Sequence, residues 1–100
     1  MTVMVDPLMH HGWVLRGRTV MSCHLICDGD LNELHALAAR IGMQRKWFQP
    51  HGAIPHYDLT EAKRTDAVRA GAVEIDRRGV VFWVRLWRFW NGGRRHWGAS

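Results

Sequence analysis

The stretch IPHYDLTEAKR, residues 54–64, concentrates side chains that could do chemistry. His56 and Asp58 offer an imidazole nitrogen and a carboxylate oxygen, which are common ligands of divalent metal ions. A fold could bring His24 or Asp6 to the same place, and a metal-bound water there could attack a phosphodiester. The candidate metal ligands are therefore Asp6, His24, His56 and Asp58, and the candidate catalytic residues are His24, His56 and Asp58.

The same stretch also fits an anion site at the start of a helix expected over residues 59–70. The first turn of a helix presents free N–H groups and a partial positive charge, both of which attract phosphate. In this interpretation the phosphate-binding residues are His56, Tyr57, Lys63 and Arg64. An acidic residue at position 58 would oppose a bound phosphate.

A third interpretation of the stretch is purely structural. Asp58 and Glu61 have the spacing of a capping box, so Asp58 could simply cap the helix that follows, at about 1 kcal/mol. The sequence leaves all three interpretations open. A divalent metal ion is the cofactor that the first of them would require.

The charge of the chain is concentrated near its C-terminus. The net charge is +5. Basic and acidic residues balance over residues 1–75, whereas residues 76–100 contain six arginines and one aspartate. Four of the six tryptophans lie in the same segment, namely Trp83, Trp87, Trp90 and Trp97. The chain is thus expected to have a neutral body and a basic, Trp-rich tail.

Arginines interleaved with tryptophans are typical of surfaces that bind nucleic acid, where arginines contact phosphates and indoles stack on bases. The same residue types are favoured in protein–protein interfaces. The candidate contact residues for nucleic acid or for a host protein are Arg85, Arg88, Trp87, Trp90, Arg94 and Arg95. A packed element with solvated arginines is the plainer alternative.

Strands that alternate with helices predict a small single domain of the α/β or α+β class, with about three strands and two to three helices. Strands are expected over residues 2–5, 19–26 and 72–75, helices over residues 31–41 and 59–70, a loop over residues 7–18 and a linker over residues 46–55. In the second strand, Cys23, Leu25 and Cys27 should share one face and His24 the other. The helix over residues 31–41 should begin at an Asp30 cap.

Residues 80–90, VVFWVRLWRFW, are predicted to form a strand after a DRRG hairpin turn, because the run is rich in β-branched and aromatic residues. A helix capped by Asp76 is the alternative, and it would place Arg85 and Arg88 on one face.

Several features predict a cytoplasmic protein. Residues 1–9 lack the pattern of a signal peptide, and no apolar run approaches the ~20 residues of a membrane-spanning helix. Cys23 and Cys27 are separated by roughly 13 Å along a strand, too far for a disulfide, so free thiols are expected. The chain has no Gly-rich phosphate loop and no serine nucleophile elbow.

The segments MTVMVD, HLICDGDLNELHALAARIGMQRKWFQ and PHYDLTEAKRTDAVRAGAVEI together resemble the DUF4031 family of bacterial and phage proteins. The resemblance covers roughly residues 1–78, which would form the core domain, with residues 79–100 packed on it or extending from it. It implies the signature positions Asp6, His24, Asp28, His35, Trp47, Phe48, His56, Tyr57, Asp58 and Arg64. It implies no activity. The family pattern usually continues as a polar helix, from which Gly79 and the apolar run after it depart.

The function expected from the sequence is the binding of nucleic acid or of another phosphate-bearing ligand. One alternative is a metal-dependent phosphoesterase or nuclease centred on His56 and Asp58. The other is a phage-type interaction protein whose tail binds and inhibits a host factor.

Overall fold

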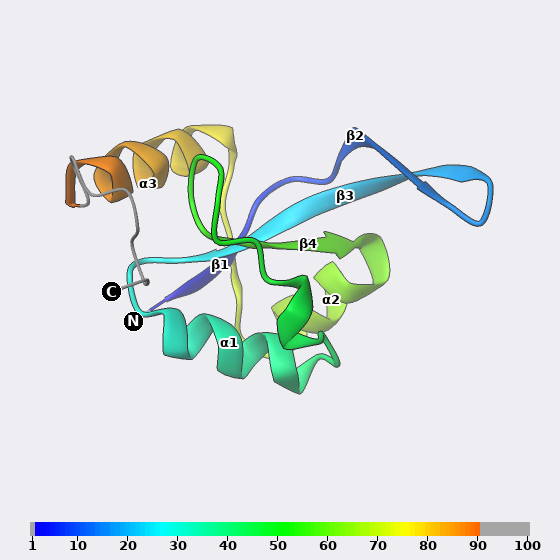
Figure 1. Cartoon of the computed structure of the whole chain (residues 1–100), viewed down its shortest axis with the longest axis horizontal. Helices are drawn as coiled ribbons and strands as arrows, with labels where there is room; N and C mark the ends of the chain where they lie inside the picture. Colours follow the sequence, from blue (N-terminus) through cyan, green and yellow to red (C-terminus); the bar gives the residue numbers. More distant parts are fainter. Residues whose placement is uncertain (1, 91–100) are drawn as a thin grey trace.

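The structure is a computed structural model, and it describes residues 2–90. The strands are β1 (Val3–Val5), β2 (Met9–Leu15), β3 (Arg18–Cys27), β4 (Tyr57–Thr60) and β5 (Val73–Glu74). The helices are α1 (Leu31–Arg40), α2 (Glu61–Arg69) and α3 (Arg77–Trp90), with a short 3-10 helix at Arg45–Trp47 (Figure 1). The predicted contact residues Arg94 and Arg95 lie outside the described residues.

The five strands form one mixed sheet in which β3 is central. β1, β2 and β4 all pair with β3 in antiparallel fashion, and β5 joins the far side of β1 in parallel. The domain is therefore α+β. The expectation of about three strands was too low, because β2 and β4 were not predicted.

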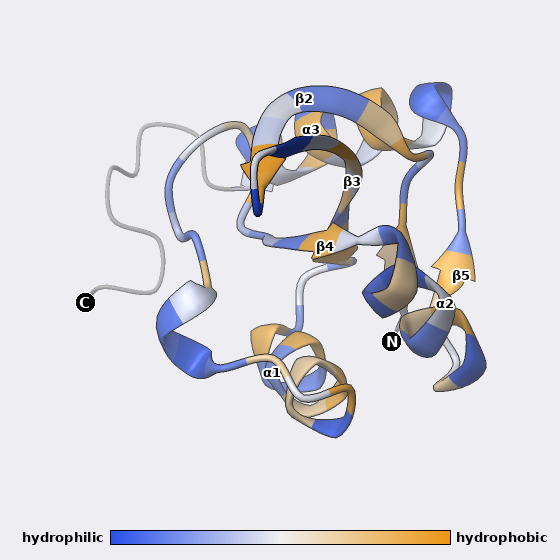
Figure 2. Cartoon of the chain, turned by 90° about the vertical axis from the view of Figure 1, so that its right-hand side faces the viewer, coloured by the Kyte–Doolittle hydropathy of each residue, from blue (hydrophilic) through white to orange (hydrophobic). Residues whose placement is uncertain are grey.

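The two faces of the sheet carry different helices. α1 and α2 lie on one side of β3 and β4, whereas α3 lies on the other side (Figures 1 and 2). The strand alternation predicted for β3 is confirmed, because Cys23, Leu25 and Cys27 join the core that α1 and α2 cover. His24 and Ile26 consequently face the α3 side.

The prediction of a strand over residues 80–90 was wrong, because these residues belong to α3. Asp76 begins this helix by accepting a hydrogen bond from the backbone N–H of Gly79 at 2.9 Å. Trp83, Val84 and Trp87 then share one helical face, and this face packs against Met4, Ile26 and Ile54. Burial of that face outweighs the β propensity of the individual residues.

The prediction of a loop over residues 7–18 was also wrong, since β2 and β3 form a hairpin there. Arg16 and Gly17 make its two-residue turn, with φ of 53° and 78°. Positive φ at both central residues is the requirement of a type I′ turn. β2 is exposed along most of its length, so its sequence lacks the apolar alternation that signals a strand.

The helix caps differ in how well they were predicted. Asp30 caps α1 as expected, and its side chain accepts a hydrogen bond from the N–H of Asn32. Asp58 does not cap α2, because it lies within β4. Thr60 is the cap instead, and its hydroxyl oxygen accepts a hydrogen bond from the N–H of Lys63 at 3.3 Å. The capping interpretation of Asp58 is therefore wrong.

The cap leads to a first prediction. Thr60→Ala should lower the free energy of unfolding by about 1 kcal/mol, because the N–H of Lys63 loses its acceptor. Thr60→Ser should retain nearly all of the stability, and urea unfolding monitored by circular dichroism would measure both. An equal loss in the two variants would contradict the assignment of this cap.

Both cysteines are free and buried. Burial raises the pKa of Cys23 to about 12 and that of Cys27 to about 11. At pH 8 the reactive thiolate is scarce in the folded state, so a disulfide reagent such as DTNB should label neither cysteine. Both should react after unfolding in guanidinium. Rapid labelling of the folded protein would contradict the burial of these strand residues.

Candidate metal centre

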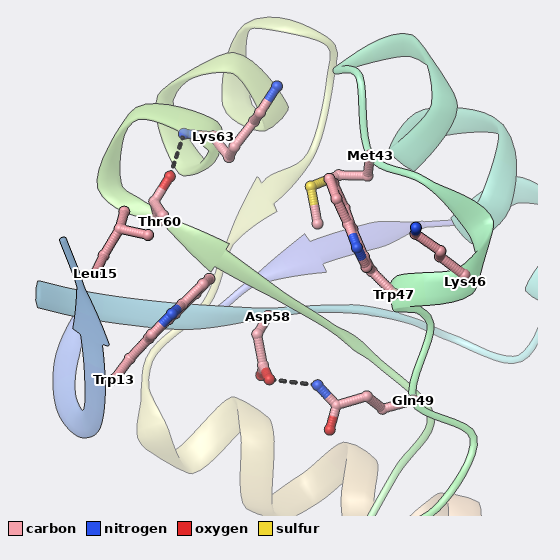
Figure 3. Close-up of a pocket in the computed structure, with 9 residues that line it drawn as sticks. All are labelled: Trp13, Leu15, Met43, Lys46, Trp47, Gln49, Asp58, Thr60 and Lys63. Carbon is pink, nitrogen blue, oxygen red and sulfur yellow. Dashed lines mark hydrogen bonds between the residues drawn. The ribbon is translucent and has the colours of Figure 1, made fainter.

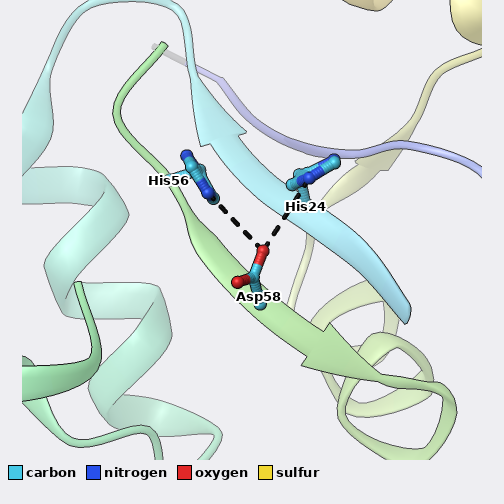
Figure 4. A group of neighbouring side chains, drawn as sticks. All are labelled: His24, His56 and Asp58. Atoms are coloured by element: carbon cyan, nitrogen blue, oxygen red, sulfur yellow. Dashed lines mark ion pairs between the residues drawn. The ribbon is translucent and has the colours of Figure 1, made fainter. Parts of the chain in front are cut away.

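Three potential metal ligands converge on the α3 side of the sheet: His24, His56 and Asp58 (Figure 4). His24 in β3 is the direct cross-strand partner of Asp58 in β4. His56 comes two residues before Asp58, so the period of a strand places both on the same face. One ligand atom from each residue lies within 4.8 Å of the other two. The structure thus joins the predicted candidates His24, His56 and Asp58.

The separations of the ligand atoms are close to those of a metal site. Asp58 Oδ1 lies 3.5 Å from His56 Nε2 and 3.8 Å from His24 Nε2. Two ligands in a tetrahedral zinc site, each ~2.1 Å from the ion, are about 3.4 Å apart. Each of these two separations is within a few tenths of an ångström of that spacing.

Both histidines have their other ring nitrogen engaged. Nδ1 of His24 lies 2.7 Å from Asp6 Oδ2, and Nδ1 of His56 lies 2.8 Å from the backbone oxygen of Ile54. Each partner is an acceptor, so Nδ1 carries the proton and donates it. In the neutral ring this leaves the lone pair on Nε2, which faces Asp58. Metal-ligating histidines in proteins are typically fixed in this way.

Asp6, predicted as a candidate ligand, instead lies behind His24 and orients it. Its side chain is almost completely buried, and its Oδ1 accepts the backbone N–H of His24 at 2.6 Å. The backbone oxygen of Asp6 accepts a hydrogen bond from Nε of Arg64 at 2.9 Å, and Arg64 also pairs with Glu74. The hydrogen bond with Asp6 raises the pKa of His24, although burial of the ring offsets part of the rise.

Asp58 is held from a second direction by Gln49. Nε2 of Gln49 donates a hydrogen bond to Asp58 Oδ2, which leaves Oδ1 facing the two histidines. Gln49 reaches this position because it pairs with His56 through an isolated β-bridge. The side chain of Asp58 remains 38% exposed, so one side of the cluster is open to solvent. Gln49 was not predicted, since nothing in its sequence neighbourhood marks it.

The four predicted phosphate-binding residues are not gathered at the start of α2. His56 lies in the cluster just described, whereas Tyr57 faces the opposite side of the sheet, with its hydroxyl 2.8 Å from Nδ1 of His35. The ammonium group of Lys63 donates to the backbone oxygen of Ile41. Arg64 is occupied by Asp6 and Glu74.

His35 lies among aromatic side chains rather than at the metal-ligand cluster. Its ring contacts Phe48 edge-on with centroids 4.5 Å apart, and burial lowers its pKa. Phe48 and Tyr57 are neighbours as well, with centroids 5.4 Å apart. These residues form an aromatic cluster on the α1 side of the sheet, away from His24 and Asp58.

The predicted contact residues of the tail divide between two sides of α3. Trp87 packs into the core beneath the helix. Arg85, Arg88 and Trp90 are exposed, as are the apolar side chains of Phe82 and Phe89. No helix within residues 2–90 is long and apolar enough to cross a membrane.

The sequence matches the model of a protein family. The model of the family described as "Protein of unknown function (DUF4031)" covers residues 3–86. The chain belongs to the DUF4031 family. The family region includes the whole His24–His56–Asp58 cluster and extends into α3, beyond the boundary at residue 78 suggested by the resemblance. No curated protein and no solved structure gives a significant match.

Eight of the ten signature positions that were expected from the sequence fall into two spatial groups in the structure. Asp6, His24, His56 and Asp58 form the candidate metal centre, and Arg64 supports Asp6 from behind. His35, Phe48 and Tyr57 form the aromatic cluster on the other face.

Proposed function

We propose that this DUF4031 protein is a divalent-metal-dependent phosphoesterase. The observation that carries the proposal is the arrangement of His24, His56 and Asp58, in which two Nε2 atoms and a carboxylate oxygen face one another. The hydrogen bonds at both Nδ1 atoms hold the rings in the orientation that metal binding requires. Two histidines and one carboxylate form a common ligand set for catalytic zinc and for other divalent ions.

Three protein ligands leave at least one coordination position for water or substrate. A divalent ion in such a site lowers the pKa of a bound water and polarises a phosphoryl oxygen. In the proposed reaction the water oxygen forms a bond to phosphorus and the ester P–O bond breaks. The alcohol leaves with a proton that the attacking water supplies through solvent. His24, His56 and Asp58 hold the ion, while Asp6 and Gln49 fix the orientation of His24 and Asp58.

The surroundings favour an anionic substrate. Lys46 and Lys63 line the same hollow as Asp58, and Asp58 is the only acidic residue among the nine described residues that line it. The net charge of +5 also attracts anions over longer distances. Phosphoesters meet both requirements, because they carry negative charge and present oxygen to a metal ion.

An assay of phosphodiester hydrolysis tests the proposal. The protein should release p-nitrophenol from bis(p-nitrophenyl) phosphate when Mn²⁺ or Zn²⁺ is supplied, and EDTA should stop the reaction. His24→Ala should be inactive under the same conditions. The absence of turnover with either ion, together with no uptake of metal in a calorimetric titration, would refute the proposed function.

Asp6 provides a more specific prediction. Asp6→Asn should weaken the affinity for Mn²⁺ by about 10- to 100-fold, because the amide supports the Nδ1–H of His24 less well than a carboxylate. Oδ1 can still accept the backbone N–H of His24, so the fold should persist. Asp66→Asn makes the same chemical change at an exposed side chain on α2 and should leave the affinity unchanged. Equal Mn²⁺ affinities in the two variants would show that Asp6 does not support metal binding through His24.

A further inference from the structure

A hollow of about 610 Å³ adjoins the candidate metal centre (Figure 3). Its volume falls within the range of small-molecule binding sites. Its walls include Trp13, Leu15, Met43, Lys46, Trp47 and Asp58. We refer to this feature as the Trp13–Trp47 hollow.

The hollow and the metal centre share Asp58. The carboxylate lines the hollow and also faces both histidines through Oδ1. Gln49, which holds Oδ2, lines the hollow as well. The hollow therefore borders the carboxylate that would bind the metal ion.

The lining is mainly apolar and aromatic, although it lies at the surface. Trp13 comes from β2 and Trp47 from the 3-10 helix, and Figure 3 shows the two indoles on either side of β4, with Asp58 on the same side as Trp13. The side chains of Trp47 and Leu15 are each 43% exposed. Indole rings that remain open to solvent favour a planar aromatic ligand, because stacking covers their faces. A simple phosphate ion would leave these walls uncovered.

We propose that the Trp13–Trp47 hollow binds a nucleobase, so that the substrate is a nucleotide unit with its phosphate at the metal centre. This inference rests on the proposed phosphoesterase function and names its substrate class. The base would lie against Trp13 and Trp47, and Lys46 is close enough to the hollow to attract the sugar–phosphate. A free mononucleotide and a unit of a single strand share this chemistry.

Calorimetric titration with AMP, with a short oligothymidylate and with inorganic phosphate tests the inference. Each titration is performed in EDTA and again with Mn²⁺. Trp47→Ala should weaken the binding of AMP or of the oligonucleotide by about 5- to 150-fold, the loss expected for one stacked base. It should leave the binding of inorganic phosphate to the Mn²⁺-loaded protein unchanged. Trp47→Phe, which keeps an aromatic face, should restore most of the affinity.

Phe89→Ala is the matched control, since Phe89 is an aromatic residue that is 80% exposed on α3 and does not line the hollow. It should bind AMP and the oligonucleotide like the wild type. Binding of AMP indicates a mononucleotide substrate, and binding of the oligonucleotide alone indicates a single strand. Wild-type affinity in Trp47→Ala, or no nucleotide binding by the wild type, would overturn the inference. If AMP or the oligonucleotide binds in a Trp47-dependent way but no Mn²⁺ is taken up, the nucleobase site is supported. In that case only the proposed phosphoesterase function is refuted.

Discussion

His56→Ala is expected to weaken the affinity for Mn²⁺ by more than about 100-fold and to abolish phosphoester hydrolysis. Loss of an outer hydrogen-bond partner alone reduces metal affinity by about 10- to 100-fold, so loss of a ligand should cost more. The substitution also removes Nε2 of His56, which lies 3.5 Å from Asp58 Oδ1. Isothermal titration calorimetry would give the affinity and the stoichiometry.

His51→Ala is the control for this variant, because His51 is exposed and does not belong to the cluster. It should bind one ion with wild-type affinity. Circular dichroism should show that both variants remain folded, since the ring of His56 is not part of either hydrophobic core. Stoichiometric binding that survives in His56→Ala would show that the ligand set is wrong.

Leu59→Ala should lower the free energy of unfolding by about 2–5 kcal/mol, which is the usual cost of removing a leucine from a packed core. Leu59 is completely buried in the core beneath α1 and α2. It lies in β4 between Asp58 and Thr60, so it anchors the strand that carries the site. Urea denaturation would measure the change.

Leu15→Ala makes the same substitution at a position that is 43% exposed, and it should cost far less stability. If Leu59→Ala and Leu15→Ala lost similar amounts, below about 1 kcal/mol, the burial of β4 and the orientation of Asp58 would be contradicted.

The sequence was sufficient to predict the elements in which neighbouring apolar residues lie on one face of a strand or helix. In β3 the alternation of apolar residues assigned Cys23 and Leu25 to the core and His24 to the other face, as the structure shows. His56 and Asp58 were candidates because of their residue types and their closeness in the sequence, whereas the strand that holds Asp58 was not predicted. α1 followed from its Asp30 cap and its apolar stripe.

The elements that were missed depend on long-range packing. α3 was expected only as the alternative to a strand, although Trp83, Val84 and Trp87 have the spacing of one helical face, which covers Ile26 and Met4. β2 is exposed on most positions and is held by its hairpin with β3. β4 is short, and its pairing with β3 joins segments far apart in the chain.

The supporting part of the site was likewise hidden from the sequence. Asp6 is 18 residues from His24, and its role behind the ring depends on the register of β1 against β3. Trp13 and Trp47 come from β2 and from the 3-10 helix, which meet only in the folded chain. Residue types alone identified candidate metal ligands, but they could not distinguish the ligands from residues such as Asp6 that orient them.

Anomalous diffraction from crystals soaked in Mn²⁺ tests the metal centre most directly. The anomalous difference map should show one peak about 2.0–2.3 Å from Nε2 of His24, Nε2 of His56 and a carboxylate oxygen of Asp58. Asp6 should remain on the far side of the His24 ring, bonded to Nδ1. A peak bound elsewhere, or none among these three side chains at a saturating Mn²⁺ concentration, would contradict the proposed metal centre.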